Sequence, residues 1–268
     1  VQPSNTTAGA AIAPAVQVTA RDAQGNTATG FTGSIVVAIG TNPASGVLSG
    51  TTTVAAVAGI ASFSNLSIDK AGTGYTLQAT SGVLTAATSA AFDITPGAAT
   101  QLAVTVQPSN TAAGAAVTPA VQVTARDAQG NTATAFTGNV VVAIGTNPGG
   151  GTLAGTTTVA AVAGVATFSN LSIDKAGTGY TLQATSGLLT AAASTAFDIT
   201  PGTATQLAVT VQPSNAVAGG TVTPAVQVTA RDAQGNTATA FTGNVVVAIG
   251  TNPGGGTLAG TTTVAAVA

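Results

Sequence analysis

The chain has 268 residues, with five Lys and Arg, seven Asp and no Glu, His or Cys, and its formal net charge is -2. So few positive charges offer no basic surface for phosphates, which argues against nucleic acid as a partner. Polar residues or Gly interrupt every apolar stretch well before about 18 residues, so the sequence predicts no membrane-spanning helix. Val, Thr, Ile and Gly dominate and favour strands and turns.

The strongest pattern is an internal repeat. The sequence VQPSN at residues 1–5 recurs at 106–110 and 211–215, which gives a period of 105 residues. Residues 1–105 differ from residues 106–210 at 16 positions, nearly all of them exchanges among small or β-branched residues. A period of this length matches a whole domain and is too long for one turn of a solenoid.

The domain boundaries follow from two proline-containing segments. Pro96 and Pro201 are each followed by Gly, and such a pair cannot continue a strand ladder. Residues 100–106 then alternate apolar and polar side chains, as a half-buried strand does. We therefore expect an incomplete repeat lacking its first strand (1–95), a linker (96–99), a complete repeat (100–200), a second linker (201–204) and the N-terminal part of a third repeat (205–268).

In chain order, the complete repeat begins with two alternating strands. Leu102, Val104 and Val106 share one face of the first strand, and Val121, Val123 and Ala125 share one face of the second. The sequence DAQGN follows the second strand and predicts a turn. We expect the Asp127 carboxylate to cap this turn and Gly130 to supply a positive φ, and Asp22 and Gly25 are their counterparts in the first copy.

The remaining segments are short and separated by turns. Residues 140–144 are almost continuously apolar, which indicates a strand at the centre of a sandwich. Residues 156–162 and 165–168 predict a strand pair that turns at Ala163 and Gly164, and a parity break between Phe168 and Ile173 indicates a bulge or a change of sheet. A last strand is expected over residues 189–199. Seven to nine short strands, with turns about every 8–12 residues, predict a β-sandwich.

Tyr180 lies at the start of a predicted strand, in GTGYTL, where a tyrosine corner would place it. We expect its hydroxyl to bond backbone, since buried tyrosines usually find a local partner. Tyr75 is the counterpart in the first copy. A ligand-binding tyrosine is the alternative interpretation.

Three segments in order, VTARDAQGNT at 123–132, GVATF at 164–168 and GYTLQA at 179–184, resemble bacterial immunoglobulin-like repeats of the invasin and intimin kind. The resemblance covers nearly the whole chain. It implies an all-β protein of tandem immunoglobulin-like Greek-key β-sandwiches of about 105 residues each, used outside the cell as spacers, stalks or adhesive elements. The chain departs from better-known members in the near-identity of its copies and in its low charge.

The sequence offers few residue types that catalyse reactions. Without His or Cys, neither a Ser/His/Asp nor a Cys/His arrangement can form within these residues, so we expect no enzyme activity. No cofactor is expected. The oxygens of Asp127, Asn131 and Asp198 are hard ligands of the type that calcium prefers, and Asp198 near the linker could share an ion with the next repeat.

These features favour a structural repeat of an extracellular or cell-surface bacterial fibre or stalk. A charge-poor surface offers little repulsion between molecules, so other copies of the chain or neighbouring repeats are the expected partners. One alternative is an adhesin repeat that binds a host or carbohydrate ligand, for which Phe136 is the candidate exposed aromatic. The other is a passive stalk that carries a catalytic domain elsewhere.

Overall fold

The computed structural model describes residues 1–82 and 84–267, and it contains strands and no helix within them. No helix of the described residues is therefore long and apolar enough to cross a membrane. Val83, a position that differs between the first two copies, and Ala268, in the expected third repeat (205–268), lie outside the described residues.

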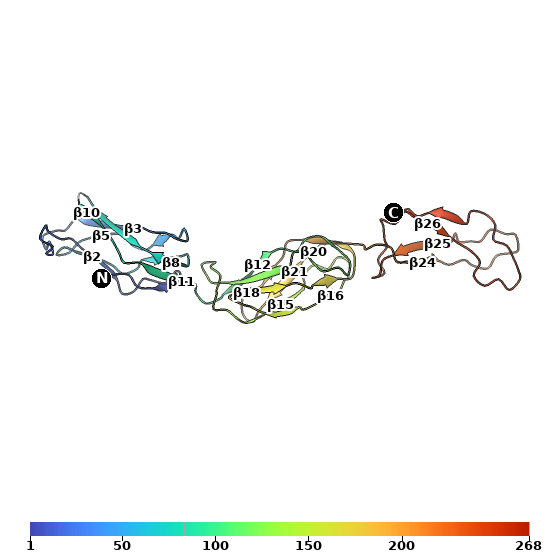
Figure 1. Ribbon diagram of the computed structural model, residues 1–268, viewed down its shortest axis with the longest axis horizontal. Helices are drawn as coiled ribbons and strands as arrows, with labels where there is room; N and C mark the ends of the chain where they lie inside the picture. Colours follow the sequence, from blue (N-terminus) through green and yellow to red (C-terminus); the bar gives the residue numbers. More distant parts are fainter. Residues whose placement is uncertain (83, 268) are drawn as a thin grey trace.

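Three groups of strands follow one another along the long axis of the molecule, with their long dimensions end to end (Figure 1). We call them the first repeat (residues 1–95), the second repeat (100–200) and the third repeat (205–267). The first and second repeats each enclose a hydrophobic core of their own, and neither core includes a side chain of the other repeat.

The second repeat contains two main sheets. In one, β14 (Val121–Arg126) lies between β12 (Gln101–Val106) and β18 (Val165–Phe168). The other has the order β17 (Thr158–Ala160), β15 (Asn139–Ile144), β21 (Leu182–Thr185) and β22 (Ala192–Ala193). The pairs β14–β18 and β15–β21 join strands distant in the chain, so the connections cross between the sheets. This is the arrangement of an immunoglobulin-like β-sandwich.

Two smaller sheets lie toward one end of the second repeat. β23 (Phe197–Thr200) pairs in parallel with β13 (Thr111–Ala112) and antiparallel with β20 (Gly177–Tyr180). β16 (Leu153–Ala154) pairs with β19 (Ser172–Ile173). The chain therefore changes partner between Phe168 on β18 and Ile173 on β19, at the position where the sequence loses its alternation.

The first repeat has the same layers. β2 (Val16–Thr19) pairs with β6 (Ile60–Phe63), and β3 (Ser34–Ile39) lies between β5 (Thr53–Ala55) and β9 (Leu77–Ser81), which pairs with β10 (Leu84–Thr88). β11 (Phe92–Thr95) lies between β1 (Thr6–Thr7) and β8 (Gly72–Tyr75), and β4 (Leu48–Ser49) pairs with β7 (Ser67–Ile68). In the described part of this repeat, β2 pairs with β6 alone.

The third repeat comprises two strand pairs, β24 (Gln206–Val211) with β25 (Gln227–Arg231) and β26 (Asn244–Val246) with β27 (Thr263–Ala265). Leu207 on β24 is 54% exposed, whereas its counterpart Leu102 on β12 is 5% exposed. The difference arises because strands β18 to β23 cover this face in the second repeat. Residues 205–267 have counterparts only as far as residue 162.

Three details differ from the sequence-based expectations. β15 alternates buried and exposed side chains, with Val142 buried and Val141 41% exposed, because its sheet forms one outer layer of a two-layer sandwich. The turn at Ala163 and Gly164 has positive φ at both residues, but it connects β17 and β18, which belong to different sheets. The expected strand 189–199 is divided into β22 and β23.

Tyr180 is fully buried and joins the core to a surface turn. Its ring packs against Phe197, with 6.3 Å between the ring centroids, and its hydroxyl donates a hydrogen bond of 2.9 Å to the carbonyl oxygen of Lys175. Tyr75 makes the same contacts with Phe92 and Lys70, at 6.2 and 2.9 Å. The core thereby fixes the turn that holds each lysine.

Replacing Tyr180 with Phe should lower the free energy of unfolding of the second repeat by about 1–2 kcal/mol, because the Lys175 carbonyl loses its donor in a half-buried position. Urea unfolding followed by circular dichroism measures this change. Thr178→Ala, at an exposed position of the same strand, is the control. An unchanged midpoint in Tyr180→Phe would show that this hydroxyl contributes nothing to stability.

Candidate functional site: the junction between repeats

Two turns meet wherever one repeat follows another. We call residues 69–72 and 174–177 the lysine turns; they lie at the end of the first and second repeats that faces the following repeat. We call residues 22–26, 127–131 and 232–236, near the start of each repeat, the Asp-Asn turns. The lysine turn of one repeat contacts the Asp-Asn turn of the next.

The Asp-Asn turn is held by its own aspartate. The Oδ1 atom of Asp127 accepts hydrogen bonds from the backbone N–H groups of Gln129 and Asn131, at 2.9 and 2.8 Å. Gly130 has φ of +80°, a left-handed conformation that glycine adopts without a steric penalty. This Asx geometry presents the Asn131 side chain outward, toward the preceding repeat.

The Asn131 amide bonds the backbone of the first lysine turn in both directions. Its Nδ2 donates to the carbonyl of Asp69 at 2.8 Å, and its Oδ1 accepts from the N–H of Ala71 at 3.0 Å. The Lys70 ammonium donates to the carbonyl of Gln129 at 3.2 Å. One side-chain amide and one ammonium group thus connect the two repeats.

The second junction repeats this contact set. Asn236 donates to the Asp174 carbonyl at 2.9 Å and accepts from Ala176 at 3.0 Å, and Lys175 donates to the Gln234 carbonyl at 3.0 Å. These distances match those of the first junction within 0.2 Å. Repeats joined by the same bonds to the same atoms adopt the same local geometry at each step.

The linkers are tied to the same turns. The N–H of Gly97 donates to Oδ2 of Asp127 at 2.9 Å, and that of Gly202 donates to Oδ2 of Asp232 at 2.8 Å. Pro96 and Pro201 precede these glycines, are half-buried, and restrict φ. Each linker is therefore bonded to the repeat that follows it.

The aspartate of the turn is buried wherever a repeat precedes it. Asp127 and Asp232 are each 1% exposed, whereas the Asp22 turn is exposed along its length. Burial raises the pKa of Asp127, but hydrogen bonds from Gly97 and from the Asp-Asn turn outweigh it and hold this pKa below the ordinary value. The pKa of Asp232 is lowered in the same way.

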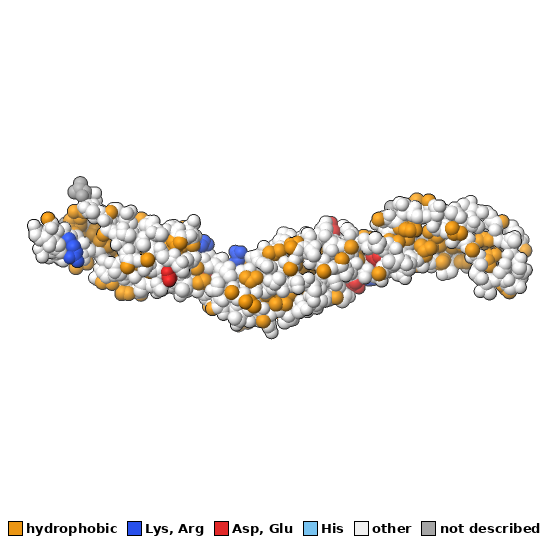
Figure 2. All heavy atoms as spheres, in the orientation of Figure 1, with side chains coloured by type: hydrophobic (Ala, Val, Ile, Leu, Met, Phe, Trp, Pro, Cys, Tyr) orange, Lys and Arg blue, Asp and Glu red, His pale blue; other side chains and the backbone are white. Residues whose placement is uncertain are grey.

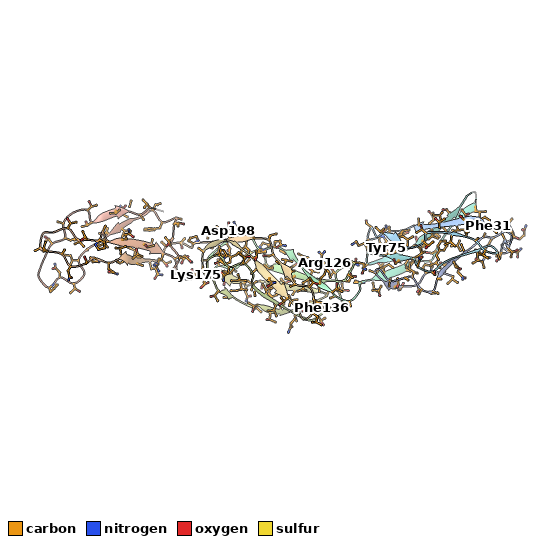
Figure 3. The ribbon with its side chains drawn as sticks, turned by 180° about the vertical axis from the view of Figure 1, so that it is seen from behind. Phe31, Tyr75, Arg126, Phe136, Lys175 and Asp198 are labelled. Atoms are coloured by element: carbon orange, nitrogen blue, oxygen red, sulfur yellow. The ribbon has the colours of Figure 1, made fainter. Side chains whose placement is uncertain are left out.

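The structure does not bring the calcium candidates together. Both oxygens of Asp127 already accept N–H donors, including the Asn131 amide at 3.0 Å. Asp198 and Arg126, the residue before Asp127, lie toward opposite ends of the second repeat (Figure 3), and Asp198 accepts from the N–H of Gly179 at 2.9 Å. Among the described residues, no three Asp or other metal-ligating side chains form a group. Calcium binding stays a prediction that these contacts do not favour.

The second lysine turn, residues 174–177, is half-buried at three side chains and at Gly177, because the third repeat lies against it. One surface expectation requires correction. Phe136, the candidate exposed aromatic, is half-buried and packs against the core of the second repeat (Figure 3).

The sequence carried one signal for the junction. Ten of its twelve charged residues lie in the lysine turns, in the Asp-Asn turns or directly before the latter; the other two are Asp93 and Asp198. On the face shown in Figure 2, most of the few charged side chains accordingly lie near the ends of repeats.

No protein-family model matches the sequence, and no curated protein matches it. Solved structures with a similar arrangement include a β-glycosidase from Bacteroides vulgatus, with a TM-score of 0.33 and 11% identity over 63% of this chain and 21% of the enzyme. Invasin, a bacterial integrin-binding protein, aligns with a TM-score of 0.32 and 14% identity over 92% of this chain and 48% of invasin. The protocadherin GammaB4 extracellular domain aligns with a TM-score of 0.29 and 11% identity over 94% of this chain and 39% of that domain. The chain thus spans about a fifth of the glycosidase and about half of invasin.

Replacing Asn131 with Ala should loosen the first junction, because three hydrogen-bonding groups lose their partner, at a cost of about 1–3 kcal/mol. Spin labels on cysteines placed at exposed Thr73 and Thr178 report the distance between the two repeats, and its distribution should broaden. Asn26→Ala is the matched control, since Asn26 bonds Asp22 within its own turn. Equal distributions in wild type and Asn131→Ala would contradict the assigned role of the amide.

Acid should loosen both junctions. The folded-state pKa values of Asp127 and Asp232 lie below the ordinary value of 3.8, so their carboxylates stabilise the junctions fully above that pH. This stabilisation is lost as the pH falls from 3.8 through the folded-state pKa, because a protonated oxygen no longer accepts from Gly97 or Gly202. The spin-label distances between residues 73 and 178, which report the first junction, should be constant from pH 7 to pH 5 and broaden below about pH 4. In a double variant with Asn in place of Asp127 and Asp232, the distance distribution should be broad already at pH 7. A wild-type distribution that does not change at acidic pH would contradict this explanation.

Proposed function

We propose that this chain is a rod-forming segment of an extracellular or cell-surface bacterial fibre, built from immunoglobulin-like repeats of the invasin type that associate with further copies of themselves. The main support for this proposal is that the two junctions form the same hydrogen bonds between corresponding atoms, at nearly the same distances.

Equal junctions make an array mechanically regular. When each repeat is related to the next by one fixed rotation and translation, the repeats follow a screw axis, and the array behaves as a stiff helical rod. Flexible linkers would instead let each repeat sample many orientations. Here the linker N–H groups of Gly97 and Gly202 are bonded to buried aspartates, which favours the rod.

The surface chemistry supports contact with other copies. The chain has 4% charged residues, so neighbouring rods would meet little electrostatic repulsion. An adhesin repeat would be expected to expose aromatic side chains at one site, as binding hot spots are rich in such residues. The half-buried Phe136 lends that alternative no support. The proposal assigns no catalysis to these residues, which include no His, Cys or Glu.

Electron microscopy of purified arrays with two, four and six copies of residues 100–204 tests the rod. The contour length should increase linearly, by about 40 Å per repeat, and the rods should be straight or uniformly curved. Arrays with Asn→Ala at every Asp-Asn turn should bend irregularly at the same contour length. Images of wild-type arrays as freely jointed beads would refute the rod-forming role, and sedimentation as monomers at all concentrations would refute self-association.

A further inference from the structure

One residue of the Asp-Asn turn touches the preceding repeat with both its backbone and its side chain. The carbonyl of Gln129 accepts from the Lys70 ammonium at 3.2 Å, and the half-buried Gln129 side chain lies on the backbone of Gly9. A β-carbon at Gly9 would lie 2.7 Å from Cδ and 3.2 Å from Cγ of Gln129, whereas ordinary van der Waals contact is 3.4–4 Å. The glutamine therefore occupies the space that any side chain at Gly9 would need.

The second junction contains the same contact. A β-carbon at Gly114 would lie 2.7 Å from Cδ and 3.3 Å from Cγ of Gln234, and the Gln234 carbonyl accepts from Lys175 at 3.0 Å. Gly9 and Gly114 both have φ of +77°. The contact is thus formed twice, by corresponding residues and with nearly the same geometry.

The glycine lies in a turn that the preceding repeat holds firmly. We call residues 7–10 and 112–115 the glycine turns. The N–H of Ala8 donates to the carbonyl of Thr95, directly before the linker, and the N–H of Gly9 donates to the carbonyl of Ile68, directly before the lysine turn, each at 2.8 Å. The corresponding bonds of residues 113 and 114 are also 2.8 Å long. Each glycine turn therefore connects the two parts of its repeat that meet the next one.

Two separate constraints require glycine at this position. Its left-handed φ disfavours other residues, and the neighbouring glutamine leaves no room for a side chain. Gly74 in the same repeat is subject to the first constraint only, since its φ is +82° and no atom lies within 4 Å of the place of a β-carbon. Backbone conformation alone does not bring a glutamine against a glycine, so the contact at Gly9 is a feature of the junction.

The hydrogen bonds and the glutamine restrict the junction in opposite directions. The bonds of Asn131 and Gly97 are attractive and are lost when the repeats move apart. The packed side chain of Gln129 is repulsive at short range and resists closer approach over the glycine turn. Attractive contacts without this side chain would let the two repeats tilt toward each other until other atoms met.

We propose that Gln129 and Gln234 are spacers that set the angle between successive repeats, and that Gly9 and Gly114 are the seats that receive them. The seat needs glycine, and the spacer needs a side chain long enough to reach it from the Asp-Asn turn. Two repeats are joined at this angle only when the first carries the glycine turn and the second carries the glutamine. This inference deepens the proposed rod-forming role and rests on it.

Replacing Gln129 with Ala removes the spacer but keeps the hydrogen bonds of its backbone carbonyl and of Asn131. The chain has no cysteine, so pairs of introduced cysteines can carry spin labels. The label sites are exposed counterparts on the two main sheets, Ala38 with Ala143 and Ser62 with Thr167. A change of tilt should shift the mean distance of one pair relative to the other, whereas Asn131→Ala should broaden both distributions. Unchanged mean distances in Gln129→Ala would overturn the spacer role.

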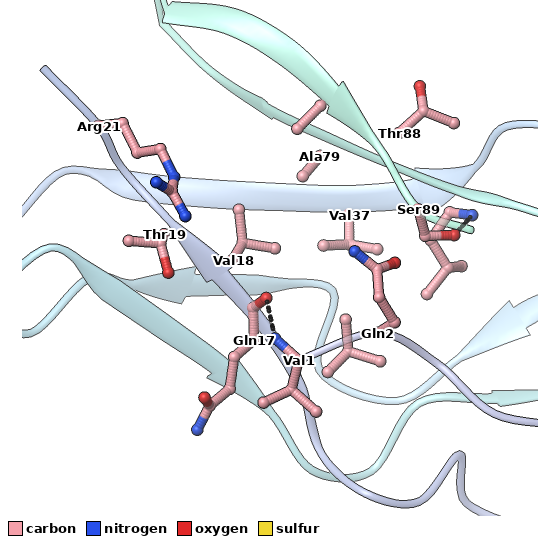
Figure 4. Close-up of a pocket in the computed structure, with 13 residues that line it drawn as sticks. Val1, Gln2, Gln17, Val18, Thr19, Arg21, Val37, Ala79, Thr88 and Ser89 are labelled. Atoms are coloured by element: carbon pink, nitrogen blue, oxygen red, sulfur yellow. Dashed lines mark hydrogen bonds between the residues drawn. The ribbon is translucent and has the colours of Figure 1, made fainter. Parts of the chain in front are cut away.

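Gln17→Ala is the matched control for truncation of a glutamine. Gln17 lies on β2 and lines a pocket whose lining residues all belong to the first repeat (Figure 4). Its side chain is exposed, so its truncation should leave both mean distances at their wild-type values. A shift as large as that of Gln129→Ala would show that the distances do not report the spacer, and would count against the proposal.

Gly9→Ala tests the seat. The added methyl group should displace Gln129 and shift the same distances, whereas Gly74→Ala introduces backbone strain alone and should not. In the double variant with Gly9→Ala and Gln129→Ala the methyl group meets no glutamine, so the combined shift should be smaller than the sum of the single shifts. Additive shifts would overturn the pairing. If Gly9→Ala prevents folding of the first repeat, Gln129→Ala decides the question alone.

Arrays of residues 100–204 separate this inference from the rod itself. With Gln→Ala at every Asp-Asn turn, the arrays should remain rods but with a uniform curvature or twist that differs from the wild type. Rods of the same shape with and without the glutamines would overturn the spacers and leave the proposed rod standing. Wild-type arrays that appear as freely jointed beads would refute the rod, and the spacers with it.

Discussion

The geometry of the molecule depends on one side-chain amide at each junction. Asn131 and Asn236 each donate to one backbone group of the preceding lysine turn and accept from another. An amide can do this because it carries a donor and an acceptor in one plane, so the pair of bonds fixes orientation as well as distance. Each neutral bond contributes only about 0.5–1.5 kcal/mol. Several such bonds, acting together with a short linker, restrict the angle between repeats.

Buried groups on both sides hold that amide and its target in place. On one side, the Asp127 carboxylate accepts the N–H groups of its own turn and of Gly97, so the linker and Asn131 are positioned by the same group. On the other side, the tyrosine hydroxyl anchors the lysine turn to a core aromatic pair. The core of one repeat therefore determines where the next repeat begins, and the same chain of contacts recurs 105 residues later.

The sequence predicted the local features that form the junction but not the contact between the two repeats. Local chemistry was sufficient to predict the Asx turn at Asp127, the backbone role of Tyr180 and the proline linkers, since each depends on residues within a few positions. The bond between Asn131 and Asp69 joins residues 62 apart in the chain, and its formation depends on how two separate sandwiches are oriented. Periodicity describes the interior of each repeat and does not specify that orientation. The error at β15 has a similar origin: a run of Val predicts a strand, but layer position decides whether Val141 is covered.

Near-identity of the repeats has a further physical consequence. Because the Asp-Asn turns and lysine turns are the same in every copy, the front of any repeat is complementary to the back of any other, in the same chain or in another molecule. Among the described residues, the junction hydrogen bonds do not distinguish the correct neighbour from a foreign one. Covalent connection alone gives the correct neighbour its advantage, through an effective concentration of about millimolar order for a short linker. The same regularity that makes the two junctions equal therefore leaves connectivity within the chain to select between neighbouring repeats.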